Sequence, residues 1–362
     1  MASLYRRVAR MFMVGFPGRA PDAELEALID DGVFGAILFK RNVGTAEETA
    51  ALCRRLKERA GRRFLISVDQ EGGRVARLRG APFTALPSMR EVGARGEAVA
   101  EQVGRLLAHE LRAVGFDFDF APVLDVDTNP ANPVIGDRSF ASDAQAVARL
   151  GLALARGLEA GRVASCGKHF PGHGDTHQDS HLTLPHLPHA LERLRQVELV
   201  PFRDYAEAKL ASIMTAHVIF DAVDPSVPAT LSQKVLTDLL KGELGFDGVV
   251  VSDDLEMKAI ADNYPVEDAA VLGTRAGVDL FLVCHHADVQ RRAIEAVVHA
   301  VESGRISQAR IDDANLRLDR LAAKFGHPPE DRLATLGDSA HRTLAEGLTA
   351  HATGSDPTEQ LA

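Results

Sequence analysis

The chain has 362 residues, 46% of them hydrophobic, and a formal net charge of −10 at pH 7. One (β/α)₈ barrel commonly takes about 250 residues, so this length fits a single barrel with extra loops and a tail. The acidic balance argues against nucleic acid or an anionic membrane surface as the main partner. The three well-separated cysteines predict free thiols in a reducing compartment rather than disulfides or a zinc site.

The start of the chain carries no sign of targeting. Its first apolar stretch, residues 11–16, is interrupted by Gly15 and followed by Pro17, which makes it too short for a signal-peptide core or a membrane span. We therefore expect a cytoplasmic protein without membrane or nucleic-acid partners, either a monomer or a weak oligomer.

Short apolar runs alternate with amphipathic stretches along most of the chain. The runs predict buried strands near residues 10–16, 33–39, 64–68, 116–121, 163–167, 211–216, 248–252 and 278–283. The stretches between them predict helices over 23–30, 46–59, 98–114, 141–160, 191–208, 233–240, 265–276 and 289–303. Alternation predicts a parallel sheet, and eight repeats predict an α/β fold closed into a TIM-type barrel. A doubly wound open sheet would more often have about six strands and a glycine-rich first turn.

A division of the chain into barrel and extension follows from the same pattern. We expect residues 1–325 to form the catalytic barrel, with a last helix over 309–325. Residues 326–362 are rich in Pro, Gly, Asp, Ser and Thr and predict a C-terminal extension that is partly helical or disordered.

Ionisable residues follow nearly every predicted strand. In barrels the active site lies at the carboxyl ends of the strands, so this placement marks one rim as functional. The residues in question are Lys40, Arg41, Asp69, Glu71, Arg74, Arg77, Asp125, Asp137, Arg138, Lys168, His169, His217, Asp253, Asp254, His285 and His286.

The segment after the fifth predicted strand is unusually rich in histidine and aspartate. Residues 170–184 read FPGHGDTHQDSHLTL, and their proline and glycines exclude a regular helix or strand. Gly172 and Gly174 would let a long mobile loop swing over a substrate. The residues alone leave three other readings open: a histidine-rich surface loop, a metal site, and a Schiff-base role for Lys168. For Lys168 we prefer a charged hydrogen bond to a substrate hydroxyl.

Asp253 and Asp254 end the run GVVVSDD. A buried strand aims a carboxylate rigidly, which suits a nucleophile that must hold its geometry. Adjacent residues of an extended segment point opposite ways, so we expect only one of the two to face the barrel mouth. The other would cap a helix that starts near Leu255.

Four motifs resemble the bacterial β-N-acetylglucosaminidases of glycoside hydrolase family 3, of the type that recycles peptidoglycan. They are, in chain order, VDQEGGRVARL at 68–78, GDRSF at 136–140, KHFPGHGDTHQDSH at 168–181 and GFDGVVVSDDLEM at 245–257. The resemblance runs from about residue 10 to residue 325. It implies a retaining mechanism with a covalent glycosyl-enzyme, and no cofactor or metal.

The resemblance also implies roles for individual residues. The nucleophile maps to Asp253, and the acid/base maps to His181, held by Asp179. A histidine titrates near neutrality, and a carboxylate beside it fixes its tautomer. The implied sugar-binding residues are Asp69, Arg77, Arg138, Lys168 and His169.

Several neighbouring residues receive no firm role. Structural ion pairing is an alternative for Arg77 and more so for Arg74, which could brace the site. His217 and Asp254 would support the site from behind, and His177 stays unassigned.

The substrate that the resemblance implies is a terminal, non-reducing β-linked N-acetylglucosamine on a cell-wall (muropeptide) fragment of the N-acetylglucosaminyl-anhydromuramyl type. A Schiff-base or metal-dependent barrel enzyme and a non-catalytic sugar-binding barrel remain the alternatives.

Overall fold

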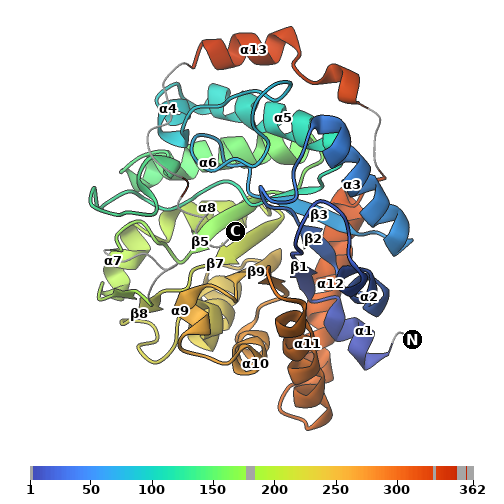
Figure 1. Ribbon diagram of the computed structural model, residues 1–362. Helices are drawn as coiled ribbons and strands as arrows, with labels where there is room; N and C mark the ends of the chain where they lie inside the picture. Colours follow the sequence, from blue (N-terminus) through green and yellow to red (C-terminus); the bar gives the residue numbers. More distant parts are fainter. Residues whose placement is uncertain (1–2, 177–183, 329–331, 349–355, 357–362) are drawn as a thin grey trace.

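The computed structural model describes residues 3–176, 184–328, 332–348 and 356 of the chain. Eight parallel strands form one sheet that curls into a nearly closed barrel with helices around it (Figure 1). Hydrogen-bonded neighbours follow the order β4-β3-β2-β1-β10-β9-β7-β5. The strands are β1 (Phe12–Val14), β2 (Gly35–Ile37), β3 (Leu65–Val68), β4 (Phe118–Asp119), β5 (Cys166–Phe170), β7 (Ser212–Thr215), β9 (Val249–Asp254) and β10 (Leu280–Val283). The predicted α/β barrel is therefore confirmed, and the open doubly wound sheet is excluded.

The edges of the sheet, β4 and β5, meet through the segments around them. The amide of Cys166 donates to the carbonyl of Ala121 at 2.7 Å, and the amide of Lys168 donates to that of Pro122 at 3.0 Å. Two parallel bridges, Phe118 with Ala164 and Val123 with Lys168, complete the contact. A second, two-stranded sheet of β6 (His186–Leu187) and β8 (Ile219–Phe220) lies beside the barrel.

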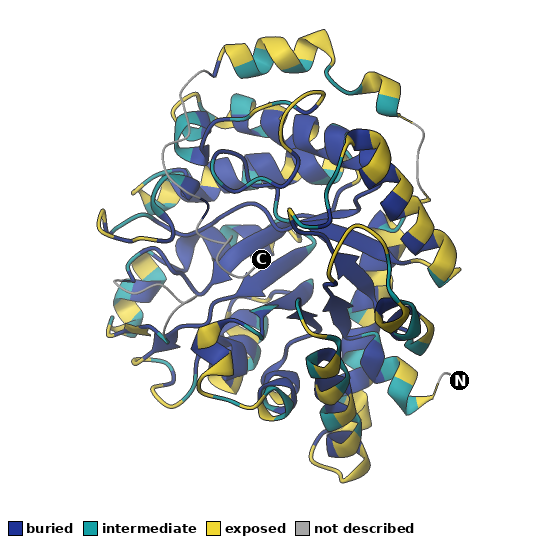
Figure 2. Cartoon of the chain, in the orientation of Figure 1, coloured by how far each residue is buried: buried dark blue, intermediate teal, exposed yellow. Residues whose placement is uncertain are grey.

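Helices cover the outer face of the barrel and turn their apolar sides toward it, as Figure 2 shows. Helix α3 illustrates how the sequence determines where such a helix begins and ends. Thr45 and Glu48 form a reciprocal capping box at its start, and Gly61 at φ 59° ends it in the left-handed conformation. The helices up to the last barrel helix are α1 (Leu4–Ala9), α2 (Ala23–Asp31), α3 (Ala46–Ala60), α4 (Met89–Gly93), α5 (Glu97–Val114), α6 (Ala144–Ala160), α7 (Leu191–Gln196), α8 (Val200–Glu207), the π-helix η3 (Lys234–Glu243), α9 (Lys258–Ala261), α10 (Val266–Ala276), α11 (Ala287–Glu302) and α12 (Gln308–Phe325).

Strand β5 differs from its predicted range. It begins at Cys166 and extends through Phe170, whereas the apolar run placed it at 163–167. The strand continues beyond the apolar run, because Lys168 and His169 have polar side chains but their backbone is still part of the strand. A register irregularity against β7, between Gly167 and Phe170, accompanies this change.

The predicted helix 191–208 is split in two. Helix α7 ends at Gln196 and α8 starts at Val200, with Val197 at φ −127° and ψ −75° between them. Pro201 lies in the first turn of α8, where its missing N–H costs no hydrogen bond.

The described part of the C-terminal extension passes outside the barrel helices. It contains η4 (Leu333–Thr335) and α13 (Ser339–Glu346), and α13 lies beyond α4 and α5 in Figure 1. The rings of His341 and His109 meet edge to face at 4.8 Å, and Thr335 Oγ1 hydrogen-bonds His109 Nε2 at 3.1 Å. These contacts attach the extension to α5.

Among the helices in the described ranges, we find none that combines the length and the apolar character needed to cross a membrane.

Candidate active site

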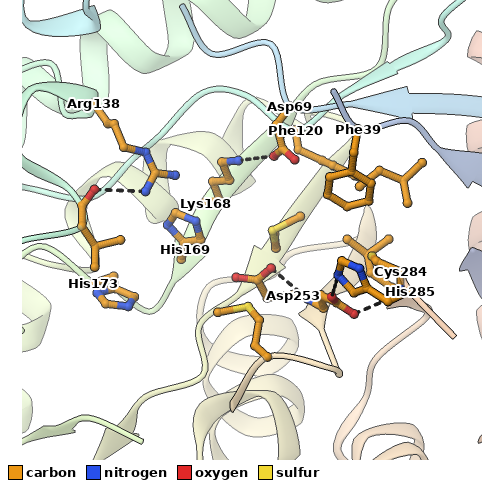
Figure 3. Close-up of a pocket in the computed structure, with 16 residues that line it drawn as sticks. Phe39, Asp69, Phe120, Arg138, Lys168, His169, His173, Asp253, Cys284 and His285 are labelled. Carbon is orange, nitrogen blue, oxygen red and sulfur yellow. Dashed lines mark hydrogen bonds and ion pairs between the residues drawn. The ribbon is translucent and has the colours of Figure 1, made fainter. Parts of the chain in front are cut away.

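A cavity opens at the carboxyl ends of the strands, where the sequence predicted the functional rim. Strand ends and the loops after them supply its lining, and Figure 3 shows their side chains converging. The lining residues are Ile37, Phe39, Asp69, Phe120, Val134, Arg138, Lys168, His169, His173, Met214, Asp253, Asp254, Met257, Leu282, Cys284 and His285. Four of the five predicted sugar-binding residues and the predicted nucleophile therefore share one cavity.

A chain of ion pairs crosses one wall of this cavity. Lys168 Nζ lies 2.8 Å from Asp69 Oδ1 and 2.7 Å from Glu71 Oε1. Arg138 donates to both oxygens of Glu71 at 2.8 Å, a bidentate pair with side chains only 2% exposed. Glu71 thus fixes the two cations that face the cavity.

These charges stay ionised. Burial alone would raise the pKa of Glu71, but Arg138 and Lys168 outweigh it and hold that pKa well below its usual range. Burial would lower the pKa of Lys168, yet Asp69 and Glu71 raise it above its ordinary value. A Schiff-base lysine must lose its proton to attack a carbonyl, so this environment disfavours that reading of Lys168.

His169 is held from behind by a buried carboxylate. Its Nδ1 lies 2.7 Å from Asp125 Oδ2, and Asp125 also accepts the amide of His173 at 2.7 Å. Burial would raise the pKa of Asp125, but His169 and His173 lower it overall. Asp125 therefore fixes the imidazole of His169 with its Nε2 side toward the cavity.

Asp253 approaches the cavity from the other side. It is the fifth residue of β9, and Figure 3 shows its carboxylate across the opening from Lys168, His169 and Asp69. The amide of Asp254 donates to Asp253 Oδ1 at 2.8 Å, which orients the carboxylate. A rigid strand and a short backbone hydrogen bond together hold this side chain in place.

Asp254 differs from its expected role. Both aspartates line the cavity, so strict alternation along β9 was the wrong expectation. The strand ends here, and its pairing with β10 is irregular between Leu280 and Leu282. Asp254 Oδ1 accepts the amides of Glu256 and Cys284, while Met257 rather than Asp254 precedes helix α9.

His217 supports β9 from behind. It is buried, its Nε2 lies 2.9 Å from the Asp254 carbonyl, and its Nδ1 lies 2.8 Å from Thr230 Oγ1. Since a carbonyl only accepts, Nε2 carries the proton in this contact. His217 thus holds the backbone next to Asp253 in place by a hydrogen bond.

The two arginines of the RVAR segment behave differently. Arg74 donates to Asp137 at 2.9 Å and to the carbonyls of Val134 and Ile135, so it braces the segment that carries Arg138. Arg77 is not among the lining residues. Its Nη2 lies 3.6 Å from Asp69 Oδ2, and it also pairs with Asp356.

The stem of the predicted catalytic loop is described as far as Thr176. Asp175 pairs with His189, and a Cβ at Gly174 would lie 1.8 Å from the carbonyl oxygen of Val126. Gly172 has φ 138°, where side chains are rarely accommodated. Close packing and backbone conformation thus account for both glycines. Asp179 and His181, together with His177, lie outside the described residues.

Three charged residues of this site received no role from the sequence. Glu71 lies inside the motif that supplies Asp69, and Asp125 follows the fourth predicted strand, so position along the chain could have found both. Asp356 lies in a tail without strand or helix pattern, and no signal pointed to it.

Comparison with known proteins identifies the family. The model of the glycosyl hydrolase family 3 N-terminal domain matches residues 3–321. A β-hexosaminidase of Neisseria meningitidis serogroup C is 42% identical over 279 residues, 75% of this chain and 76% of its own. One of Thiobacillus denitrificans is 42% identical over 314 residues, 85% of this chain and 83% of its own.

Solved structures agree with these relatives. A glycoside hydrolase family 3 β-N-acetylglucosaminidase from Paenibacillus sp. superposes with a TM-score of 0.92 at 42% identity, covering 96% of this chain and 68% of that one. NagZ from Neisseria gonorrhoeae, solved with N-trifluoroacetyl-D-glucosamine, gives 0.78 at 34% identity, covering 94% and 98%. The chain belongs to glycoside hydrolase family 3.

Proposed function

We propose that this protein is a retaining exo-β-N-acetylglucosaminidase that removes terminal, non-reducing N-acetylglucosamine. One observation carries the proposal: Asp253, at the end of β9, lines the same cavity as Asp69, Arg138, Lys168 and His169. A carboxylate facing a wall of hydrogen-bonding groups is the arrangement that a glycosyl-enzyme mechanism needs. The β-hexosaminidase relatives support the same substrate class.

Asp253 is the nucleophile in this proposal. Its carboxylate attacks the anomeric carbon, and the bond to the leaving oxygen breaks as that oxygen takes a proton. Water then attacks the same carbon and loses a proton to the base, while the bond between that carbon and Asp253 breaks and the carboxylate is restored. The sugar leaves with its original configuration. The amide of Asp254 holds the attacking carboxylate in one orientation.

His181 is the proposed acid/base, with Asp179 beside it. Both belong to the segment that follows the described stem. A neutral histidine does not repel the Asp253 carboxylate as a second carboxylate would, and it gives and takes a proton near neutral pH. Asp179 would fix its tautomer and stabilise the imidazolium.

The opposite wall binds the sugar. Asp69 accepts hydrogen bonds from sugar hydroxyls, while Lys168, Arg138 and His169 donate to them. Glu71 and Asp125 keep these donors in place, since each makes short hydrogen bonds behind the wall. Arg77, which lies 3.6 Å from Asp69 and also pairs with Asp356, is the fifth proposed sugar-binding residue.

We further propose that the sugar is removed from cell-wall fragments of the N-acetylglucosaminyl-anhydromuramyl type, in the cytoplasm. The motif resemblance supports this substrate. The three cysteines, all buried and free, fit a reducing compartment.

Three measurements test the proposal: turnover, covalent labelling and the anomeric configuration of the released sugar. Purified protein should release N-acetylglucosamine from a chromogenic β-glycoside, and Asp253→Ala should abolish turnover. A fluorinated N-acetylglucosamine donor that slows the second step should lose its leaving group and add the mass of its glycosyl group to the peptide that contains Asp253. Label on another peptide would overturn the nucleophile assignment, and inversion of configuration at the anomeric carbon would overturn the mechanism.

His181 is tested through the leaving group. His181→Ala should slow substrates with poor leaving groups far more than those with good ones, because the latter need little protonation. Equal losses for both kinds of substrate would contradict its role as acid.

A further inference from the structure

Asp356 brings the C-terminal tail to the sugar-binding wall. Its side chain is 4% exposed and pairs with Arg77, whose side chain is 3% exposed and which is 279 positions away in sequence. Arg77 also approaches Asp69, with Nη2 3.6 Å from Oδ2. Three successive ion pairs therefore connect this residue of the extension, through Arg77 and Asp69, to Lys168, which lines the cavity.

The path of the extension fits such a contact. Gly337 packs near Pro82, and His341 contacts His109, so η4 and α13 cross the outside of α5. Leu348, at the end of the described range 332–348, is only 3% exposed and joins the main hydrophobic core cluster. The extension is thus attached to the barrel before it reaches Asp356.

The charges explain why Arg77 needs this partner. A buried guanidinium is costly unless anions neutralise it and accept its hydrogen bonds. The ion pairs of this wall alternate in sign, and Asp356 is the carboxylate that the extension adds to the series. The series is Asp356, Arg77, Asp69, Lys168, Glu71 and Arg138.

Asp69 is placed between two cations with unequal contacts. Lys168 holds its Oδ1 at 2.8 Å, whereas Arg77 remains 3.6 Å from Oδ2, longer than a normal hydrogen bond. Asp356 draws the guanidinium of Arg77 toward itself. Asp69 Oδ2 is thereby kept from closing onto Arg77 and can accept a hydrogen bond from a sugar hydroxyl.

We propose that Asp356 is a positioning residue of the sugar-binding site, acting through Arg77 on Asp69. The proposal rests on the proposed function, because Asp69 is assigned there to the sugar. Asp356 is then part of the active site through these ion pairs, although it does not touch the reacting atoms. Its contribution is to ground-state sugar binding, so it affects KM more than kcat.

Steady-state kinetics on the full-length chain tests this. With a chromogenic N-acetylglucosaminide, Asp356→Asn should raise KM about tenfold while kcat changes less than about twofold, and Asp356→Glu should recover part of the loss. Glu346→Gln, the same charge change on an exposed residue of α13, is the matched control and should leave both constants unchanged. Thermal unfolding of each variant shows whether it is folded.

A double-mutant cycle separates positioning from general stability. If Asp356 acts through Asp69, then adding Asp356→Asn to Asp69→Asn should change the dissociation constant of N-acetylglucosamine, measured by calorimetry, by less than about twofold. An equal loss in both backgrounds would overturn the proposal.

Other outcomes also decide the matter. An unchanged KM in a folded Asp356→Asn variant would refute a positioning role, and a lower KM would identify the tail as an inhibitory contact instead. If the unmodified enzyme releases no sugar, the proposed function itself is wrong. That outcome can be distinguished from an unchanged or a lowered KM in the Asp356→Asn variant.

Discussion

The two ends of the barrel both carry buried ion pairs, and in the described residues the two ends differ in what these ion pairs hold in place. At the amino end, Asp279 precedes β10 and pairs with Lys241 at 3.0 Å and Arg310 at 2.6 Å. It also accepts the amide of Val250 at 3.0 Å, so it ties two strands and two helices together. At the carboxyl end, Glu71 makes equally short contacts with Arg138 and Lys168.

A second amino-end carboxylate repeats the pattern. Asp117 precedes β4, pairs with Lys57 at 2.8 Å and Arg112 at 2.7 Å, and accepts the amide of Ile66 at 3.0 Å. Its side chain is fully buried. The comparison teaches that buried charge by itself does not mark function. What marks the carboxyl end is that the two cations held by Glu71 line the same cavity as the carboxylates of Asp69 and Asp253.

The largest expected effect concerns the two ends of β9. Asp253→Ala at the carboxyl end should reduce kcat by at least about 10³-fold, because no nucleophile remains. Asp247→Ala, just before the same strand, removes the ion pairs of an exposed carboxylate with Arg317 and Arg320 and should leave kcat unchanged. Steady-state assays on both variants measure kcat. A similar loss of kcat in both variants would contradict the assignment of the active site to the carboxyl end.

At the amino end the expected effect is on folding. Asp279→Asn leaves Lys241 and Arg310 with a neutral partner, which should lower the free energy of unfolding by about 3 kcal/mol. Denaturant titration measures this. The folded fraction should keep its kcat/KM, and a specific loss of activity without loss of stability would contradict a structural role.

The corresponding change at the carboxyl end should be seen in substrate binding. Glu71→Gln removes the charge that orients Arg138 and Lys168, so KM should rise about tenfold, with some loss of stability. The Asp279→Asn variant is the control for a buried carboxylate lost elsewhere. Unchanged KM in Glu71→Gln would show that the two cations are held without it.

The smallest expected effect is a pH dependence of protein stability that arises from Lys241 at the amino end. Burial, helped by Arg310, lowers the pKa of Lys241 to about 8 from 10.5, while Asp279 opposes the shift. Between these values the unfolded chain binds more protons than the folded one, so stability should rise as pH increases from about 8 to about 10. Thermal unfolding of Lys241→Met should show a flatter rise, and an equally steep one would exclude Lys241 as the cause.

The sequence predicted the barrel well because each strand and helix has its own local pattern. All eight apolar runs correspond to strands, and the helix ranges agree apart from the break before Val200. Boundaries were less accurate where polar side chains continue a strand, as at Lys168 in β5. Hydrophobicity reports which residues lie in the core, and it does not report where backbone pairing ends.

The site could be predicted only in part. Asp69, Arg138, Lys168, His169 and Asp253 were expected together, and one cavity contains them all. The residues that hold them in place depend on contacts between distant parts of the chain, which leave no local pattern. The contact of Asp356 with Arg77 is the clearest example, because it joins the tail to the third strand's loop.

Gly174 limits how this enzyme can be altered. Even a methyl group at position 174 would collide with the backbone of Val126. Any substitution of Gly174 therefore requires a displacement of the main chain. Gly172, with its φ of 138°, imposes a similar restriction. Libraries that aim to change substrate preference should therefore keep both glycines constant.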